Sequence, residues 1–112
     1  IEITHNTHTF TVNDLFKSIL RDVQWNYEPS QQENILKITG TWQPNLFASY
    51  NIDETIKPDL AVNGRVTIEL QVEENIIQEE NTTVTLTYNE ENLLNETGQE
   101  TLHYLYEYYI TK

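Results

Sequence analysis

The sequence predicts an α+β fold, with an N-terminal helix, an antiparallel sheet of four or five strands, and a C-terminal helix packed on one face of that sheet. Three observations support this prediction. Apolar residues recur with helical spacing near the start, they alternate with polar residues in four later segments, and no low-complexity linker divides the 112 residues. A length close to that of one ordinary domain allows one hydrophobic core. We therefore expect residues 1–112 to form a single domain.

The predicted N-terminal helix begins at Val12. Residues 1–10 place Thr and His between scattered apolar positions, and we expect a leader that is extended or only partly ordered. Thr11 can cap the helix, with Asp14 in the third helical position, as in a capping box. The apolar stripe of this helix recurs at intervals of three and four residues and consists of Val12, Leu15, Phe16, Ile19, Leu20 and Val23.

Alternation of apolar and polar residues predicts two antiparallel hairpins. The first hairpin pairs residues 23–28 with residues 35–42, across a polar turn at residues 30–34. The second hairpin pairs residues 66–72, which have the most regular strand pattern in the chain, with residues 83–88. These four segments are the secure part of the predicted sheet.

The middle of the chain carries weaker signals. Gly40 lies inside a predicted strand, which suggests either a bulge or the close approach of another side chain, from the neighbouring Trp42 or from the helix. Residues 46–52 are a candidate short strand. In residues 53–63 a Lys-Pro-Asp triplet and the start of an Asn-Gly pair are turn signals, so we expect turns there.

The C-terminal stretch, residues 101–112, fits both a helix and a strand. Thr97 followed by Glu100 resembles a capping box, and on that ground we favour the helix, with the strand as an open alternative. The helical stripe would consist of Leu102, Leu105, Tyr106, Tyr109 and Ile110, whereas the strand face would consist of Leu102, Tyr104, Tyr106, Tyr108 and Ile110.

Charge is unevenly distributed along the chain. Eighteen acidic and six basic residues give a net charge of −12, and residues 66–112 hold ten of the acids but one base, Lys112. A surface of this sign repels phosphate backbones, so a nucleic-acid partner is disfavoured, whereas a basic protein partner would be attracted. No apolar run approaches the ~20 residues that a membrane-spanning helix needs.

The sequence offers few groups for catalysis or metal binding. There is no cysteine, and none of the three serines lies in a nucleophile elbow. His5 and His8 could share a metal only on a helical turn, so we interpret them as exposed residues, and His103 as one that packs or faces solvent. Phosphate-binding glycine loops and calcium-loop spacing are absent from the sequence. We therefore predict no catalytic residue, no metal site and no cofactor.

Aromatic residues are more numerous than one small core requires. The chain has twelve of them, and four tyrosines within six residues cannot all face inward from one helix. Tyr and Trp are frequent interface anchors, because they combine apolar area with a polar tip. We therefore predict a surface that binds a protein or a sugar, with Tyr104, Tyr108, Tyr109 and Trp42 as its candidate residues.

The order of elements resembles that of small bacterial extracytoplasmic domains of unknown function. The likeness rests on the helix over residues 11–23 that leads into Trp25, on Ile-Leu-Lys-Ile-Thr-Gly at residues 35–40, and on residues 66–72 and 102–107. Such domains follow a lipoprotein signal or a membrane anchor, so the resemblance implies an extracytoplasmic location and a non-enzymatic role. Because the chain does not begin with methionine, we expect a mature form or an excised domain, with membrane contact only through a removed N-terminal anchor.

Two functional hypotheses follow. The first is a non-enzymatic binding or assembly module of the bacterial cell envelope, whose ligand the sequence does not identify. The alternative is an acidic inhibitor, such as an immunity protein or a DNA mimic, that docks on a basic partner and whose binding weakens as salt rises. A small enzyme ranks third.

Overall fold

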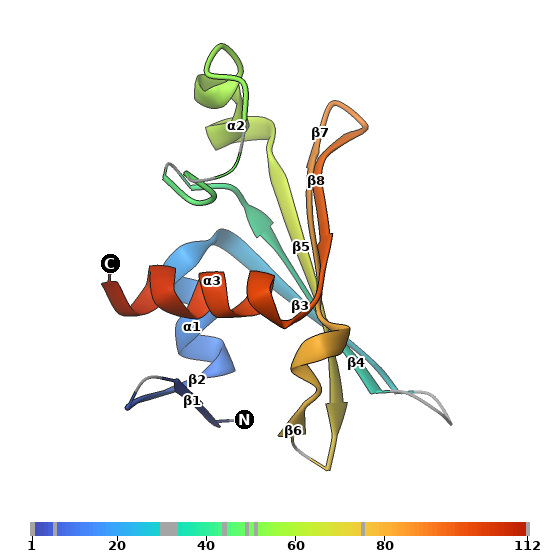
Figure 1. The fold of residues 1–112 in the computed structure, drawn as a ribbon. Coiled ribbons are helices and arrows are strands. Elements are labelled where there is room, and N and C mark those ends of the chain that lie inside the picture. The colour runs from blue at the N-terminus through green and yellow to red at the C-terminus, as the bar shows by residue number, and fades with distance from the viewer. Residues whose placement is uncertain are drawn as a thin grey trace.

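The computed structural model describes residues 2–5, 7–29, 34–43, 45–48, 50, 52–74 and 76–111. For residues 28 and 29 it describes the backbone alone. The predicted α+β class is confirmed (Figure 1). In chain order the elements are β1 (Glu2–His5), β2 (His8–Thr11), α1 (Val12–Ile19), β3 (Arg21–Pro29), β4 (Asn34–Thr41), α2 (Lys57–Asn63), β5 (Arg65–Glu73), β6 (Ile76–Ile77), the 3-10 helix η1 (Glu79–Asn81), β7 (Thr83–Tyr88), β8 (Glu91–Thr97) and α3 (Gln99–Thr111).

The first regular element is a strand, so the prediction of a helix at the start of the fold is wrong. Residues 2–5 and 8–11, which were expected to form a leader, pair as the antiparallel strands β1 and β2. Ile3 and Phe10 lie opposite each other in this pair, and both are buried in the core. Each strand contributes one core residue, which is too few to produce an alternating pattern in the sequence.

The predicted helix is present as α1, but it is the third element and is shorter than predicted. It begins at Val12, and the Thr11 hydroxyl accepts a hydrogen bond from the Asp14 backbone N–H at 3.0 Å, as the capping box predicted. It ends at Ile19, because Leu20 is already extended. The end of the apolar stripe, Leu20 and Val23, therefore belongs to the junction and to β3.

Both predicted hairpins form within one antiparallel sheet of six strands. The sheet order is β3-β4-β5-β7-β8, and β6 pairs with β5 outside this path. The strand β8 and the short strand β6 were not predicted. In β8 the apolar residues Leu93 and Leu94 are adjacent, so they give no alternation that would indicate a strand.

The segment between β4 and β5 differs from its prediction. Residues 45–48 form turns, and residues 50 and 52 lie outside any strand, whereas residues 49 and 51 of the proposed short strand lie outside the described residues. Residues 57–63, expected to be turns, form the helix α2 with Pro58 in its first turn. Proline is well suited to that position, because the first helical N–H groups have no partner within the helix.

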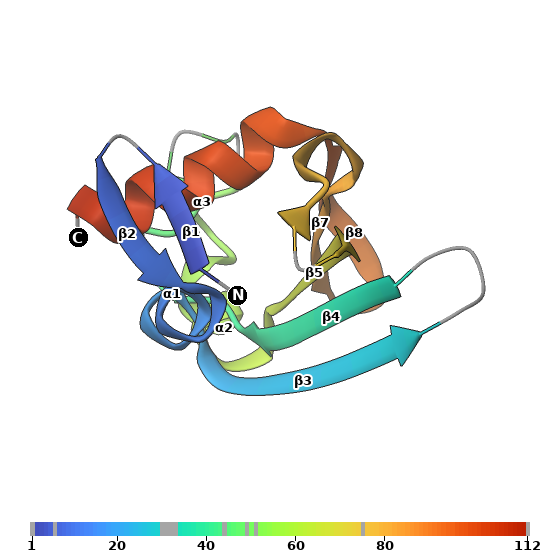
Figure 2. The same ribbon diagram turned by 90° about the horizontal axis from the view of Figure 1, so that it is seen from below.

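The helices α1 and α3 lie on the same side of the twisted sheet (Figures 1 and 2). The C-terminal stretch is a helix, as favoured, and α3 buries Leu102, Leu105 and Tyr106 in the core. Gly40 of β4 contacts the residue that follows α1, because a Cβ atom on Gly40 would lie 2.8 Å from the Leu20 Cβ atom. The close approach predicted at this glycine therefore comes from the helix side and not from Trp42.

Candidate functional site

The four predicted binding residues do not share one exposed surface. The Tyr104 and Tyr108 rings of α3 stack with centroids 6.5 Å apart, and Tyr109 packs instead against Phe10 of β2 at 4.8 Å. Trp42 is only 3% exposed. Binding by these residues stays a prediction, but Trp42 and Tyr104 both contact the loop that contains residues 45–48 and 50.

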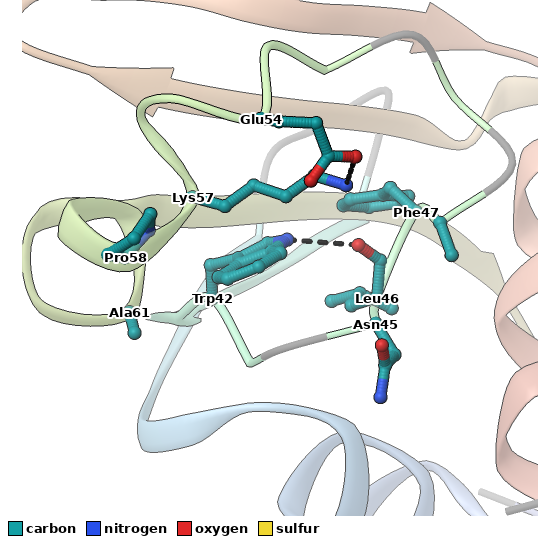
Figure 3. Close-up of a pocket in the computed structure, with 9 residues that line it drawn as sticks. Trp42, Asn45, Leu46, Phe47, Glu54, Lys57, Pro58 and Ala61 are labelled. Carbon is teal, nitrogen blue, oxygen red and sulfur yellow. Dashed lines mark hydrogen bonds and ion pairs between the residues drawn. The ribbon is translucent and has the colours of Figure 1, made fainter.

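This loop borders a cavity of about 410 Å³, which we call the Trp42 cavity. Its volume lies within the range of small-molecule sites. In Figure 3, Pro58 and Lys57 of α2 approach from one side and Leu46 and Phe47 of the loop from the other, with Trp42 between them. The further lining residues are Asn45, Ala48, Glu54 and Ala61. The walls are therefore largely apolar, with two opposite charges among them.

Three groups of Trp42 form hydrogen bonds that hold it in place: its indole N–H, its backbone N–H and its carbonyl oxygen. The indole Nε1–H donates to the Leu46 carbonyl oxygen at 3.0 Å, and the Trp42 backbone N–H donates to the Gly64 carbonyl oxygen at 3.0 Å. The Arg21 guanidinium donates to the Trp42 carbonyl oxygen at 3.3 Å and also to the carbonyl oxygen of Ala61. A Cβ atom on Gly64 would lie 2.7 Å from the Leu60 carbonyl oxygen, so this junction requires glycine for close packing.

The loop beside Trp42 holds an unusual backbone conformation. Asn45 has φ 75° and Phe47 has φ 64°, both in the left-handed region. For a bulky side chain such as phenylalanine this conformation is a genuine outlier, and such residues persist only where their surroundings hold them. Phe47 is fully buried, and its ring stacks on Tyr104 with centroids 5.7 Å apart and contacts Tyr50 at 5.3 Å.

Tyr104 supports this loop from α3. Burial raises the pKa of Tyr104, and hydrogen bonds from the backbone of Phe47 and Ala48 oppose that shift. The hydroxyl is therefore tied to the loop while the ring stacks on Phe47. The role of Tyr104 in the folded chain is to hold the cavity wall in place.

The mouth of the cavity carries one ion pair. Lys57 Nζ lies 2.7 Å from Glu54 Oε1, and in Figure 3 these two side chains point toward each other beside Trp42 and Phe47. The side chain of Lys57 is 30% exposed, whereas that of Glu54 is 83% exposed. The turn that carries Glu54 is shaped by Asp53, whose carboxylate accepts from the N–H and the hydroxyl of Thr55 at 2.9 and 2.8 Å. These hydrogen bonds lower the pKa of Asp53.

A second cluster of polar groups joins β1 to the C-terminal half. His5 Nε2 lies 2.8 Å from Glu107 Oε1, and His103 Nε2 lies 3.1 Å from Glu79 Oε1, with the two imidazole rings 5.0 Å apart. The Tyr106 hydroxyl donates to Glu79 Oε2 at 3.1 Å. Burial, together with the Glu79 carboxylate, raises the pKa of Tyr106.

Neither histidine was predicted to have a charged partner, because the partners come from distant parts of the chain. Nothing in the sequence indicated that His5 lies near His103, and the fold places their rings in contact. Among the described residues, no group of three or more His, Asp or Glu side chains is arranged to hold a metal ion. In the same part of the chain, no helix is long and apolar enough to cross a membrane.

Comparisons with protein-family models, with curated proteins and with solved structures found no match for this chain. The site must therefore be judged on its own geometry. Sequence reasoning identified Trp42 but missed Phe47, Glu54 and Lys57. The proline directly after Lys57 suits the first turn of a helix as well as a turn, so it was a signal for α2. No local pattern placed Glu54 and Lys57 at the cavity mouth.

Proposed function

We propose that the chain is a non-enzymatic binding module and that the Trp42 cavity holds a small ligand with an apolar body and one carboxylate. The observation that carries this proposal is the cavity itself, with about 410 Å³ of space, apolar walls from Trp42 and Phe47, and a lysine at its mouth. Apolar pockets with a few convergent polar groups are the usual form of small-molecule sites.

The ion pair at the mouth favours an anionic ligand group over a cationic one. Glu54 is almost fully exposed, so its carboxylate can turn into water at little cost. Lys57 is mostly covered and keeps its place beside Trp42. A ligand carboxylate can therefore replace Glu54 as the partner of the Lys57 ammonium, whereas a ligand cation would have to displace Lys57 itself.

The backbone of Phe47 adds a second argument. A strained, fully buried phenylalanine requires several contacts to hold it, and such strain gathers at ligand sites more often than elsewhere. Here the strained residue forms a cavity wall and is held by Tyr104 and Tyr50. A preformed wall lowers the entropy that ligand binding would otherwise cost.

The binding test uses two acids and their uncharged counterparts. Phenylacetate and hexanoate are titrated beside phenylacetamide and hexanamide, with Trp42 fluorescence as the readout in a Trp25→Phe background. We expect the acids to bind at least about tenfold more tightly, because a hydrogen bond to a charged group is worth about 1.5 to 3 kcal/mol. Equal affinity for acid and amide would contradict the carboxylate assignment.

Two matched variants test whether acid binding depends on the charge of Lys57 or on the positive charge of any lysine. Lys57→Met keeps most of the length of the side chain without its charge, and it should reduce acid binding to the level of the amide. Lys37→Met is the control, because Lys37 lies on β4 opposite Glu69, outside the cavity lining. If neither acid changes the Trp42 signal up to its solubility limit, the ligand proposal fails.

We also propose the cell-envelope setting that the resemblance implies. Fractionation of the native host should then recover the protein outside the cytoplasm, and recovery in the cytoplasmic fraction would contradict it. The binding proposal does not depend on this result, because the cavity and its lysine are properties of the folded chain.

The acidic-inhibitor alternative has one observation in its favour. Residues 66–111 contain ten acidic residues and no lysine or arginine, and all ten except Glu79 are exposed. Their positions reach both ends of the sheet, since Glu73 ends β5, Glu74 follows it, and Glu90 lies in the turn between β7 and β8. A complex led by this charge should weaken steeply as salt rises, whereas a ligand held mainly by the apolar cavity should not.

A further inference from the structure

A second aromatic surface lies at the opposite edge of the sheet from β8. Trp25 and Tyr27 of β3 are 39% and 54% exposed, and Trp25 borders a shallow groove of about 370 Å³ with Leu36, Val12 and Asn13. We call these five residues the β3 patch. Figure 2 shows β3 as the outermost strand, at the edge of the sheet that lies farther from α3. The groove does not share a residue with the Trp42 cavity.

The β3 patch belongs to the core-facing side of the sheet, where an apolar residue is normally covered. Trp25 lies opposite Ile38, and Tyr27 lies opposite Leu36, which in turn faces Leu70. Ile38 and Leu70 are fully buried. The covering helix α1 ends at Ile19 and reaches only one side of Trp25, through the Phe16 ring at 6.2 Å. The end of β3 therefore keeps its apolar face exposed.

The two outer strands of the sheet are protected differently. Natural sheets defend an edge strand with charged side chains, proline or short length. The outer strand β8 carries the exposed residues Glu91 and Glu96. The outer strand β3 carries Arg21, Asp22, Glu28 and Pro29 toward its ends, and its irregularity lies between Arg21 and Gln24. Its middle, Gln24–Tyr27, exposes two large apolar side chains, Trp25 and Tyr27, whereas none of the exposed large apolar residues in the described part of the chain lies in β8. The β3 edge is thus the one that offers apolar surface for another strand to cover.

The charge around the β3 patch indicates what kind of strand fits. Asp22 precedes the patch on β3, and Asp14 follows Asn13 in the first turn of α1; both are exposed. Lys37 of β4 lies opposite Asn26 and has Glu69 of β5 opposite it on its other side. Arg21 is directed elsewhere, because its guanidinium bonds the carbonyl oxygens of Trp42 and Ala61. A second copy of the chain would bring another net charge of −12 to this edge, and like charges oppose such an association.

We propose that β3 is a docking edge for an extended, basic segment of a partner protein, which adds as a strand beside Gln24–Tyr27. Backbone hydrogen bonds would supply the pairing, and alternate apolar side chains of the segment would cover Trp25 and fill the groove beside Leu36. The basic side chains alternate with these apolar ones, so they would project from the opposite face of the sheet, and those near the start of β3 would attract Asp22.

The first test uses three decapeptides that differ in one property each. The probe alternates lysine and valine, the second peptide replaces lysine with glutamate, and the third carries N-methyl groups on every second backbone nitrogen. Binding is measured by isothermal titration and by Trp25 fluorescence. We expect the lysine peptide to bind, the glutamate peptide not to bind, and N-methylation to weaken binding by about tenfold or more, because it removes the ladder hydrogen bonds.

The second test places a charge on the edge itself. Tyr27→Lys puts a cation where the basic segment would dock, and it should weaken binding of the lysine peptide by about tenfold, which is typical for loss of an interface anchor. Val62→Lys adds the same charge at a residue of α2 that is 72% exposed and should change binding little. Thermal unfolding of both variants shows whether either substitution disturbs the fold.

Three results would overturn the proposal. Equal binding of the N-methylated peptide would show that the lysine peptide attaches through charge alone. Equal losses for Tyr27→Lys and Val62→Lys would place the binding away from β3. A dimer in sedimentation that Tyr27→Lys dissociates would assign the edge to a second copy of this chain.

Discussion

The two tryptophans lie in neighbouring strands or strand ends and yet have opposite environments. Trp25 is 39% exposed on the outer strand β3, whereas Trp42, directly after β4, is 3% exposed. Both follow the alternating pattern that places a residue on the core-facing side. Trp42 is covered because the loop over residues 45–48 and the helix α2 fold back over it. Trp25 has only the short helix α1 beside it.

This difference shows that alternation determines which face of the sheet a residue lies on, but not whether other segments pack over that face. The segments that pack over it are distant in sequence or irregular in structure. For Trp42 this packing depends on Gly64, on the left-handed conformation of Phe47 and on the stacking of Tyr104. For Trp25 it would have to come from a partner, which is the basis of the docking proposal.

The largest expected effect comes from removing the covered tryptophan. Trp42→Ala should lower the free energy of unfolding by about 3 to 5 kcal/mol, because it leaves a hole and removes a hydrogen bond to Leu46. Trp25→Ala, the matched control, should cost less, about 1 to 2 kcal/mol, since Trp25 is 39% exposed and loses less burial. Urea unfolding followed by circular dichroism measures both. Equal losses would mean that the two environments do not differ in solution.

Gly64→Ala should have the next largest effect, by moving the wall while keeping the tryptophan. A Cβ atom there would lie 2.7 Å from the Leu60 carbonyl oxygen and 3.2 Å from the Trp42 Cβ atom, so the backbone must shift. We expect a loss of about 1 to 3 kcal/mol and an altered near-ultraviolet signal from Trp42. Val62→Ala, on the exposed side of α2, should leave both unchanged. A stable Gly64→Ala variant with the parent's signal would contradict the close packing.

Sequence prediction succeeded where the signal is a local pattern and failed where the structure depends on packing between distant segments. Strands with regular alternation, such as residues 66–72, and the capped start of α1 at Val12 were predicted, because their signals are local. The pairing of β1 with β2 was missed, since its contribution to the core is a single facing pair, Ile3 and Phe10. The helix α2 was missed because its proline also suits a turn.

The candidate site was predicted only in part, for the same physical reason. An aromatic residue such as Trp42 is noticeable in a sequence, but its cavity is built by a loop whose conformation depends on contacts with α3. Tyr109 was grouped with Tyr104 because they are close in sequence, yet helical geometry turns it toward Phe10. Glu54 and Lys57 matter through their position at the mouth, which no local pattern indicates.

Tyr106 provides a pH test of the cluster formed with His103 and Glu79. Its pKa is raised by burial and by Glu79, whereas in the unfolded chain it titrates near its ordinary value of about 10. Above that pH the unfolded chain loses a proton that the folded chain keeps, so stability falls as pH rises, and below it the contribution is fully present.

Tyr106→Phe should therefore make the alkaline fall in stability shallower. It should also cost about 0.5 to 1.5 kcal/mol at neutral pH, because the hydrogen bond to Glu79 is lost. Tyr27→Phe, the same change on β3, should keep the alkaline fall because Tyr106 remains. The measurement is urea unfolding from neutral pH to about pH 11. An unchanged alkaline slope in Tyr106→Phe would argue against the buried phenol as its source.

Trp25→Phe should have the smallest effect on stability. It should also show most clearly that the two tryptophans differ in exposure to solvent. This variant should change the free energy of unfolding by less than about 0.5 kcal/mol, since it keeps an aromatic ring at a partly exposed position. It should nevertheless remove most of the acrylamide quenching of tryptophan fluorescence, because the remaining emitter, Trp42, is covered by Leu46 and α2. Trp42→Phe should leave the quenching in place. Strong quenching in Trp25→Phe would show that the loop over Trp42 opens, so that the cavity wall is not preformed and any ligand must close it.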